Sequence, residues 1–331
     1  MAGRRARVAV VGVGGHGRNL AAAARAASTL EIAACFDANA QAAAKAGADL
    51  GCPVARSYDE VLADSSVAGV ILATPNALHA PQTIAAARAG KHIFVEKPMA
   101  NTLEEAREMI LEARRAQVLL QVGHNVRRGG SYRLMKELVE QGVVGRVVMA
   151  EGNFGHDGGL RLKPDQWRWT WNQCPGGAMM LLGVHHADTL AWLCGPIKRV
   201  TAFMARVATQ AEIEDACAVS LEFESGALGS INAGYAYPRQ VHLNVLGTQA
   251  NLLSDERNPY LLVVRSDGRS EQLPVEEGDT LKDEMEAFGR CILEGTRPEV
   301  AGEEGFHALA VVWAAIESSR AGKPVEVAPT P

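Results

Sequence analysis

Short apolar runs alternate with amphipathic stretches over the first 122 residues of the chain. The apolar runs indicate buried strands, and the stretches between them have the period and length of helices. Strands that alternate with helices are typical of βαβ units and of a parallel sheet with both faces covered. We expect strands over residues 7–13, 31–37, 67–74, 92–95 and 117–122, and helices over 16–28, 39–49, 57–64, 81–89 and 102–116.

The pattern changes near residue 124, and the second half of the chain is richer in strands. Residues 198–265 alternate apolar and polar positions with few helix signals, which predicts an antiparallel sheet. We expect its segments over residues 198–208, 215–224, 227–236, 240–247, 250–254 and 260–265. Around them we expect helices over 130–141, 178–193, 280–295 and 303–321, a strand over 144–154, and an irregular stretch over 155–177.

The fold class expected from these patterns is α/β, with two domains. Residues 1–124 should form a doubly wound parallel sheet, and residues 125–331 an α+β domain with a large, mainly antiparallel sheet. The closing helices could pack back on the first domain. A length of 331 residues is also what about two domains require.

Composition and charge narrow the classes of function. Hydrophobic residues make up 47% and charged residues 21% of the chain, so a packed core is affordable. A net charge of −5 does not attract nucleic acid or an anionic membrane. No apolar run approaches the ~20 residues of a membrane span. Arg4 and Arg5 precede an apolar run that glycines interrupt, so an export signal is not expected. Six dispersed cysteines without a C-x-x-C pair favour a reducing cytoplasm.

A glycine loop lies between the first expected strand and the first expected helix. It reads Gly12-Val13-Gly14-Gly15-His16-Gly17, a complete G-x-G-x-x-G in the context that supports dinucleotide binding. Gly12 allows a tight turn, Gly14 allows close approach of a pyrophosphate, and Gly17 allows helix and strand to pack. The first N–H groups of the helix would then face the phosphates. The alternative is a glycine turn with no ligand.

Asp37 ends the second expected strand, about 20 residues after the loop. A carboxylate at this point can accept hydrogen bonds from the adenosine ribose hydroxyls. The next residues are Ala38 and Asn39, so no adjacent arginine welcomes a 2′-phosphate. We therefore predict NAD as the cofactor and leave NADP open.

Glu96-Lys97-Pro98 follows the fourth expected strand. Ligands of open α/β sheets bind beyond the carboxyl ends of the strands, where a lysine can act as an acid or a base. The tripeptide alone favours an ordinary surface lysine.

In combination, these motifs resemble the glucose-fructose oxidoreductase / inositol dehydrogenase / MocA family. The resemblance covers nearly the whole chain and implies a Rossmann domain, an α+β domain whose sheet often forms subunit contacts, and NAD(P)-linked oxidation or reduction of a sugar or polyol. It implies that Lys97 touches both the substrate and the nicotinamide ribose. The matching motifs are Gly12 to Gly17, Ala73-Thr74-Pro75-Asn76-x-x-His79, Glu96-Lys97-Pro98, Pro175-Gly176-Gly177, Gly183-Val184-His185-x-x-Asp188 and Phe288…Gly295…Pro298. The positions implied to line the cofactor are Thr74, Pro75, Asn76, His79 and Glu96.

The helix expected over residues 178–193 carries the residue that matches the catalytic histidine of the family, His185. Leu181, His185, Asp188 and Trp192 would share one face of this helix. The family often has an aspartate four residues before the histidine, where this chain has Leu181. The alternative is a core histidine. The neighbouring His186 points about 100° away on a helix, so we expect no metal site.

Other residues of the second domain are weaker candidates for contact with substrate. Trp167, Trp169 and Trp171 alternate, which predicts either a short strand that packs its indoles or a wall for a sugar ring. Arg168 would then point to the opposite side. Arg127 and Arg128 are interpreted as hinge or surface charge. Three more candidates lie near expected strand ends, namely Asn153, His156 and Tyr237.

These observations favour a cytoplasmic NAD(P)-dependent oxidoreductase that moves a hydride between nicotinamide and a carbinol carbon. Lys97 would handle the hydroxyl proton and His185 would assist. A homodimer or homotetramer is expected, because a large single sheet must cover both faces. Two alternatives stay open. One is a redox-assisted glycosidase or lyase with tightly held NAD, and the other is a non-catalytic dinucleotide-binding sensor.

Overall fold

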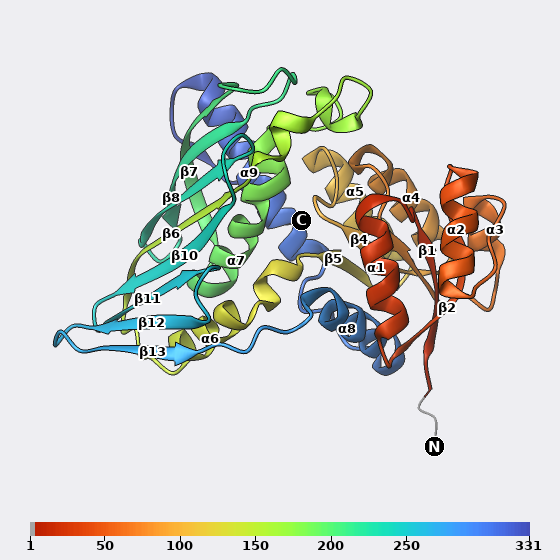
Figure 1. Cartoon of the computed structure of the whole chain (residues 1–331), viewed down its shortest axis with the longest axis horizontal. Coiled ribbons are helices and arrows are strands. Elements are labelled where there is room, and N and C mark those ends of the chain that lie inside the picture. The colour runs from red at the N-terminus through yellow and green to blue at the C-terminus, as the bar shows by residue number, and fades with distance from the viewer. Residues whose placement is uncertain (1–3) are drawn as a thin grey trace. The chain divides into compact units, whose positions relative to one another are not determined.

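The computed structural model describes residues 4–331, which form two compact units. The first unit holds the described residues up to Asn125 together with Asp279–Phe306 and Pro331. The second holds Val126–Gly278 and His307–Thr330. The chain therefore returns to the first unit for one helix and the start of the next, and it then completes the second unit (Figure 1).

The first unit contains a five-stranded parallel sheet in the order β2-β1-β3-β4-β5, which confirms the doubly wound sheet. Because β1 lies between β2 and β3, the strand order reverses there, and a ligand crevice is expected beyond the carboxyl ends of these strands. The strands are β1 (Ala6–Val11), β2 (Leu30–Phe36), β3 (Gly69–Leu72), β4 (His92–Glu96) and β5 (Leu120–Gly123).

Helices cover this sheet, and one of them, α8 (Thr280–Glu294), comes from a part of the chain far beyond the strands. Glu286 of that helix accepts hydrogen bonds from the backbone N–H of Thr29 at 3.2 Å and from the Ser28 hydroxyl at 3.1 Å. The Phe288 ring packs edge-on against Phe94 at 5.9 Å, so this helix contributes to the core. The helices are α1 (Gly15–Ala26), α2 (Ala40–Leu50), α3 (Tyr58–Ala63), α4 (Asn76–Arg88), α5 (Leu103–Arg115) and α8 (Thr280–Glu294).

Helix α4 begins at Asn76, so the expectation that it starts near Pro81 is wrong. Pro81 lies within the helix, and its missing N–H removes only one intrahelical hydrogen bond. The extra first turn matters for function because it brings Asn76 to the carboxyl end of β3.

The second unit contains a nine-stranded sheet in the order β13-β12-β11-β10-β6-β9-β8-β7-β14. Strands β6 and β9 pair in parallel and the other neighbouring strands of this sheet are antiparallel, which confirms the mainly antiparallel sheet. Strand β13 was not expected, because an exposed edge strand has no buried face to create an apolar alternation. The strands are β6 (Val147–Gly155), β7 (Ile197–Ala205), β8 (Ala216–Phe223), β9 (Leu228–Gly234), β10 (Gln240–Gly247), β11 (Ala250–Asp255), β12 (Tyr260–Arg265), β13 (Ser270–Pro274) and β14 (Val325–Glu326).

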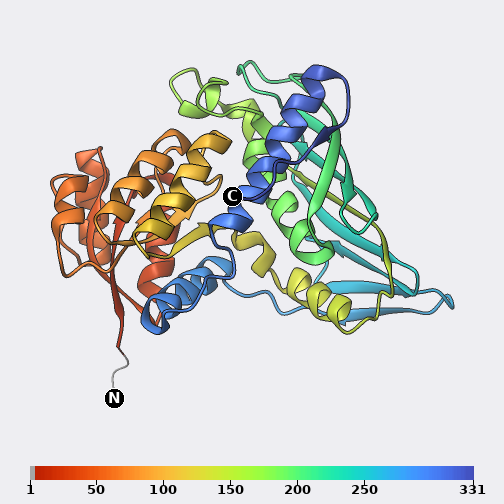
Figure 2. The ribbon, with the colours of Figure 1, turned by 180° about the vertical axis from the view of Figure 1, so that it is seen from behind.

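Helices of the second unit cover one face of its sheet (Figure 2). Two serines near the end of α9 accept hydrogen bonds from the β7 backbone, Ser318 from Ala202 at 3.1 Å and Ser319 from Met204 at 3.0 Å. Among the described residues, no helix is long and apolar enough to cross a membrane. The helical segments are α6 (Gly130–Glu140), α7 (Val184–Cys194) and α9 (Gly302–Ala321), with short turns η1 (Asn125–Arg128), η2 (Asp157–Arg161) and η3 (Trp167–Trp169) and the π-helix η4 (Met179–Gly183).

The opposite face of the nine-stranded sheet is exposed within this unit. Strand alternation places Met149, Phe203 and Leu228 on it, with exposed fractions of 41%, 82% and 54%. We call this surface the open face.

Candidate active site

The glycine loop connects β1 to α1 through two contacts that only glycine permits. Gly12 has a φ of +84°, and a β-carbon there would lie 2.8 Å from the Ala73 carbonyl. A β-carbon at Gly17 would lie 1.9 Å from the Gly12 carbonyl oxygen. The loop therefore packs directly against the end of β3, as the sequence pattern predicts.

The start of α1 leaves room for an anionic ligand. Gly14 is the N-cap residue and provides no side-chain cap for the first N–H groups of the helix. A β-carbon at Gly14 would have only the Asp37 carboxylate nearby, at 3.9 Å, and one at Gly15 would have no atom within 4 Å. Free helix N–H groups beside open space fit the pyrophosphate of a dinucleotide.

Two backbone amides hold Asp37 in place at the end of β2. Its Oδ2 accepts the N–H of Val13 at 2.9 Å, and its Oδ1 accepts the N–H of Asn39 at 2.8 Å. The carboxylate is half-buried and is fixed beside the glycine loop. Asn39 in turn caps α2, because its side chain accepts the N–H groups of the first turn. This preorganised acceptor suits a ribose hydroxyl.

The turn from β3 to α4 contains a buried polar atom that lacks a protein partner. Asn76 is 4% exposed, and among the described residues its Nδ2 has no hydrogen-bond partner. Thr74 and Pro75 precede it, and the Thr74 hydroxyl donates to Gln82 Oε1 at 2.6 Å. An orphaned amide donor at the carboxyl end of a central strand is consistent with contact to a bound dinucleotide.

His79 links two segments of this half of the site. Its Nδ1 lies 2.8 Å from the Pro98 carbonyl oxygen, and its Nε2 lies 2.8 Å from the Thr74 carbonyl oxygen. The ring is almost completely buried, and burial lowers the pKa of His79. Because both nitrogens face carbonyls of the protein, the structure gives His79 a positioning role between the Thr74 turn and the Lys97-Pro98 segment.

Glu96 connects the end of β4 to the glycine loop. Its Oε1 lies 3.3 Å from Nε2 of His16, and its Oε2 accepts the backbone N–H of Lys97 at 3.1 Å. Glu96 is buried, whereas the His16 ring is half-exposed. Lys97, also half-buried, follows directly at the carboxyl end of the strand. The first unit thus gathers every residue that the sequence assigned to the cofactor.

In the second unit, His185 lies on α7 with its ring stacked on Phe154 of β6. The ring centroids are 5.3 Å apart and the planes differ by 21°. The adjacent His186 is completely buried, and its Nε2 lies 3.0 Å from the Asn153 carbonyl oxygen. Burial lowers the pKa of His186 to about 4, so His186 is neutral near pH 7. Both rings contact Phe154, His185 stacked on it and His186 edge-on at 5.5 Å, but His186 is held by the strand backbone.

The helix expected over residues 178–193 is present, and its first part is the π-helix Met179–Gly183, which continues directly into α7. Gly183 permits this geometry, since a β-carbon there would lie 2.3 Å from Sδ of Met179. Leu181 lies inside the π-helix and is buried. Such segments are rare and frequently occur at functional sites.

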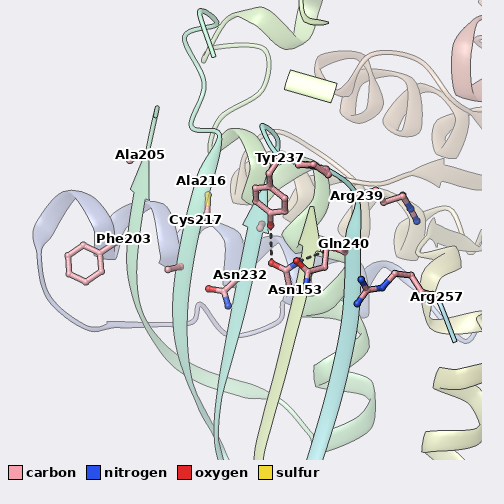
Figure 3. A pocket seen from close by; sticks show the side chains of 13 residues that line it. Asn153, Phe203, Ala205, Ala216, Cys217, Asn232, Tyr237, Arg239, Gln240 and Arg257 are labelled. Carbon is pink, nitrogen blue, oxygen red and sulfur yellow. Dashed lines mark hydrogen bonds between the residues drawn. The ribbon is translucent and has the colours of Figure 1, made fainter. Parts of the chain in front are cut away.

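The structure does not bring Asn153 and Tyr237 to His185, contrary to the prediction of one substrate site. Gly152 and Phe154 face α7, so strand alternation turns Asn153 to the open face. There its Oδ1 accepts the Tyr237 hydroxyl at 2.9 Å (Figure 3). Both residues line an open hollow of about 830 Å³ on this face, to which Phe203 and Asn232 also contribute.

The tryptophan segment is a 3-10 helix over Trp167–Trp169, so the expected alternating strand is wrong. The Arg168 guanidinium stacks over the Trp167 ring at 4.3 Å, and it therefore does not point to the opposite side. Trp171 packs edge-on against Trp313, with centroids 6.4 Å apart. His156 accepts the Gly158 N–H at 3.0 Å and so caps a local turn.

Arg127 is not the hinge or surface charge that the sequence suggested. It is buried and forms a two-pronged ion pair with Asp188 of α7. The sequence gave one indication that Asp188 matters, because it is expected on the same helix face as His185. It did not identify Arg127 as the partner of Asp188.

The glycine loop, the fixed Asp37 carboxylate and a lysine at the carboxyl edge of the parallel sheet are features of a dinucleotide-dependent oxidoreductase. Residues 6–124 match the family model described as the oxidoreductase family, NAD-binding Rossmann fold. Residues 132–253 match the model described as the GFO/IDH/MocA C-terminal domain. The chain belongs to the Gfo/Idh/MocA family of NAD(P)-dependent sugar and polyol oxidoreductases.

Named relatives include both enzymes and solved complexes. The chain is 29% identical to 1,5-anhydro-D-fructose reductase from Ensifer adhaerens, over 82% of this chain and 83% of the relative. It is 29% identical to D-xylose 1-dehydrogenase (NADP(+)) 2 from Haloferax volcanii, over 96% and 98%. The WlbA dehydrogenase from Bordetella pertussis, solved with NADH and UDP-GlcNAcA, has a TM-score of 0.88 and 28% identity over 99% of both chains.

Proposed function

We propose that this enzyme transfers a hydride between nicotinamide and a carbinol carbon of a derivatised sugar, with NAD as the preferred cofactor. The observation that carries the proposal is the placement of Lys97 directly after Glu96, which contacts the glycine loop through His16. The sugar substrates named for the relatives support the substrate class. On the cysteine pattern of the sequence, the cytoplasm stays our prediction for its location.

The role of each residue follows from the two transfers in the reaction, that of a hydride and that of the hydroxyl proton. A nicotinamide dinucleotide held by the glycine loop, Asp37 and Asn76 would supply the acceptor for the hydride of the carbinol C–H bond. Lys97, when neutral, takes the hydroxyl proton as the C=O bond forms, and it returns that proton in the reverse reaction. His185 serves as a hydrogen-bond partner for the substrate. The glycine loop, Asp37 and Asn76 hold the dinucleotide.

A panel of sugars, polyols and nucleotide sugars, offered with NAD⁺ and NADP⁺ and read at the nicotinamide absorbance, tests the proposal. Turnover with a net change in absorbance on at least one sugar derivative is expected. Formation of product without such a change would favour the redox-assisted glycosidase or lyase. Cofactor binding without turnover on the whole panel would favour the sensor.

The enzyme is expected to bind NADH at least about tenfold more tightly than NADPH, because a 2′-phosphate would lie against the fixed carboxylate of Asp37. Fluorescence titration of both reduced cofactors measures this ratio. Asp37→Ser should reduce it by removing the repulsion, and Asp49→Ser on the exposed end of α2 is the matched control. Equal or tighter binding of NADPH by the native enzyme would overturn the assignment.

The open face is proposed to form the contact between subunits of a homodimer or homotetramer. Its exposed apolar side chains, Phe203 at 82% above all, would be covered there. Light scattering should find an oligomer at micromolar concentration. Phe203→Glu should shift it toward monomer, while Leu111→Glu on the first unit should not. A native protein that is only monomeric contradicts this prediction.

A further inference from the structure

Arg127 and Asp188 form an ion pair inside the second unit, away from solvent. The Arg127 Nε donates to Asp188 Oδ2 at 2.7 Å, and a terminal guanidinium nitrogen donates to Oδ1. The side chains are 3% and 1% exposed. A buried bidentate pair fixes both partners in distance and in orientation, because the guanidinium and the carboxylate must be coplanar.

The Arg127 guanidinium also contacts the ring of Trp192, which lies one helical turn after Asp188 on α7. The Arg127 Cζ lies 5.4 Å from the centroid of Trp192, and Arg133 and Lys136 of α6 lie at 5.0 and 5.4 Å from that ring. Lys136 also donates to the Trp192 carbonyl oxygen at 2.9 Å. Arg127 therefore holds α7 at two points, and lysine could not reproduce the planar, two-pronged pair with the Asp188 carboxylate.

The clamped helix is the one that carries the candidate catalytic histidine. His185 lies three residues before Asp188, less than one helical turn away. The Thr189 hydroxyl donates to the His185 carbonyl oxygen at 2.8 Å, and the His185 ring stacks on Phe154. Any rotation of α7 about its axis would therefore move the His185 ring across Phe154.

We propose that Arg127 is a positioning residue that sets the rotation of α7, and so the placement of the His185 imidazole, through its contacts with Asp188 and Trp192. The proposal rests on the proposed function for the role of His185, but the geometry it asserts is independent of that role. The proposal assigns this role to Arg127 and not to Arg133. Arg133, on the neighbouring helix α6, contacts the same Trp192 ring.

The first measurement reads the position of the histidine directly and needs no substrate. The nine histidines are labelled with ¹³C at Cε1, and His185→Gln assigns the resonance of His185. Because the Phe154 ring shields its neighbour, this resonance should move in Arg127→Lys and stay in place in the control Arg133→Lys. An unchanged His185 resonance in a folded Arg127→Lys overturns the proposal, whatever reaction the enzyme catalyses.

The second measurement reads the consequence for turnover. In Arg127→Lys, kcat on the best substrate should fall by about 10- to 100-fold, the size expected for a displacement near 1 Å, while the dissociation constant of NADH stays native. Arg133→Lys should keep kcat within twofold. A native kcat in folded Arg127→Lys overturns the proposal.

If Arg127→Lys fails to fold, the double variant Arg127→Met with Asp188→Leu replaces the pair by apolar groups, a change that buried ion pairs often tolerate. The His185 resonance is then read in that variant. A displaced resonance supports the proposal, and a native resonance overturns it.

Discussion

Replacing Lys97 by alanine is expected to lower kcat by about 10²- to 10⁴-fold, the usual contribution of a positioned acid or base. Lys97 follows the last residue of β4 at the carboxyl edge of the parallel sheet. The carboxylate before it, Glu96, is engaged by the Lys97 backbone N–H and by His16. The glycine loop, Asp37 and Asn76 stay intact, so the affinity for NADH should fall far less than kcat, by no more than the contact with the nicotinamide ribose that the family resemblance implies for Lys97. Steady-state kinetics and fluorescence titration on the same preparation measure both quantities.

The variant Lys97→Arg tests whether Lys97 acts by transferring a proton or only by its positive charge. Arginine keeps a positive charge but does not release its proton near neutral pH, so this variant should be as inactive as the alanine variant. Lys45→Ala on α2 is the control for loss of a lysine elsewhere. Near-normal turnover by folded Lys97→Ala on the true substrate would remove Lys97 from the mechanism.

The fold of the first unit could be predicted because its strands are buried on both faces. Val8, Val10 and Ile71 are completely buried, and such continuous apolar runs are readable without knowledge of their neighbours. The same rule explains why β13 was missed, since its side chains are mostly exposed. The first turn of α4 was missed because a proline is usually taken as a helix start, whereas here it lies inside the helix.

The cofactor half of the site was predictable for a different reason. The roles of Gly12 and Gly17 depend on contacts within a few residues of a strand end, at 2.8 and 1.9 Å for a β-carbon that is absent. The Gly17 contact with Gly12 lies inside the loop, so local sequence encodes it, whereas the Gly12 contact with Ala73 joins distant segments and could be expected only from the G-x-G-x-x-G pattern between a strand and a helix. The role of His79 beside the cofactor stays a prediction, and its two carbonyl partners, on Thr74 and Pro98, come from separate segments that the sequence does not connect.

The substrate half was less predictable because its residues depend on strand register and on distant partners. A shift of one position decides whether a strand residue faces the helices or the open face, and a place near a strand end, the only basis for proposing Asn153, does not determine that face. Arg127 and Asp188 are 61 residues apart in sequence. A pairing at that separation leaves no periodic signal, which is why the sequence alone suggests hinge or surface charge for Arg127.

Leu181 is the clearest departure of this chain from the family pattern, and it leads to an expectation about substrates. Leucine cannot accept a hydrogen bond from a sugar hydroxyl or from His185, and Leu181 is buried in the π-helix just before α7. A site without that acceptor gains nothing from a hydroxyl at the facing position. Free myo-inositol, which carries a hydroxyl on every ring carbon, should therefore be a poorer substrate than a substituted or derivatised sugar.

Leu181→Asp is expected to shift the ratio of kcat/KM for myo-inositol over that for the best sugar derivative by about 10²-fold toward inositol. The physical reason is the restored carboxylate, which can bind a hydroxyl or hold one tautomer of His185. Leu181→Ala is the control, because it shortens the side chain without supplying an acceptor, and it should leave the ratio near its native value. Melting temperatures identify any loss of folded protein, since a carboxylate at a buried position destabilises the fold. Efficient turnover of inositol by the native enzyme, no lower than in Leu181→Asp, would show that the leucine does not set the specificity.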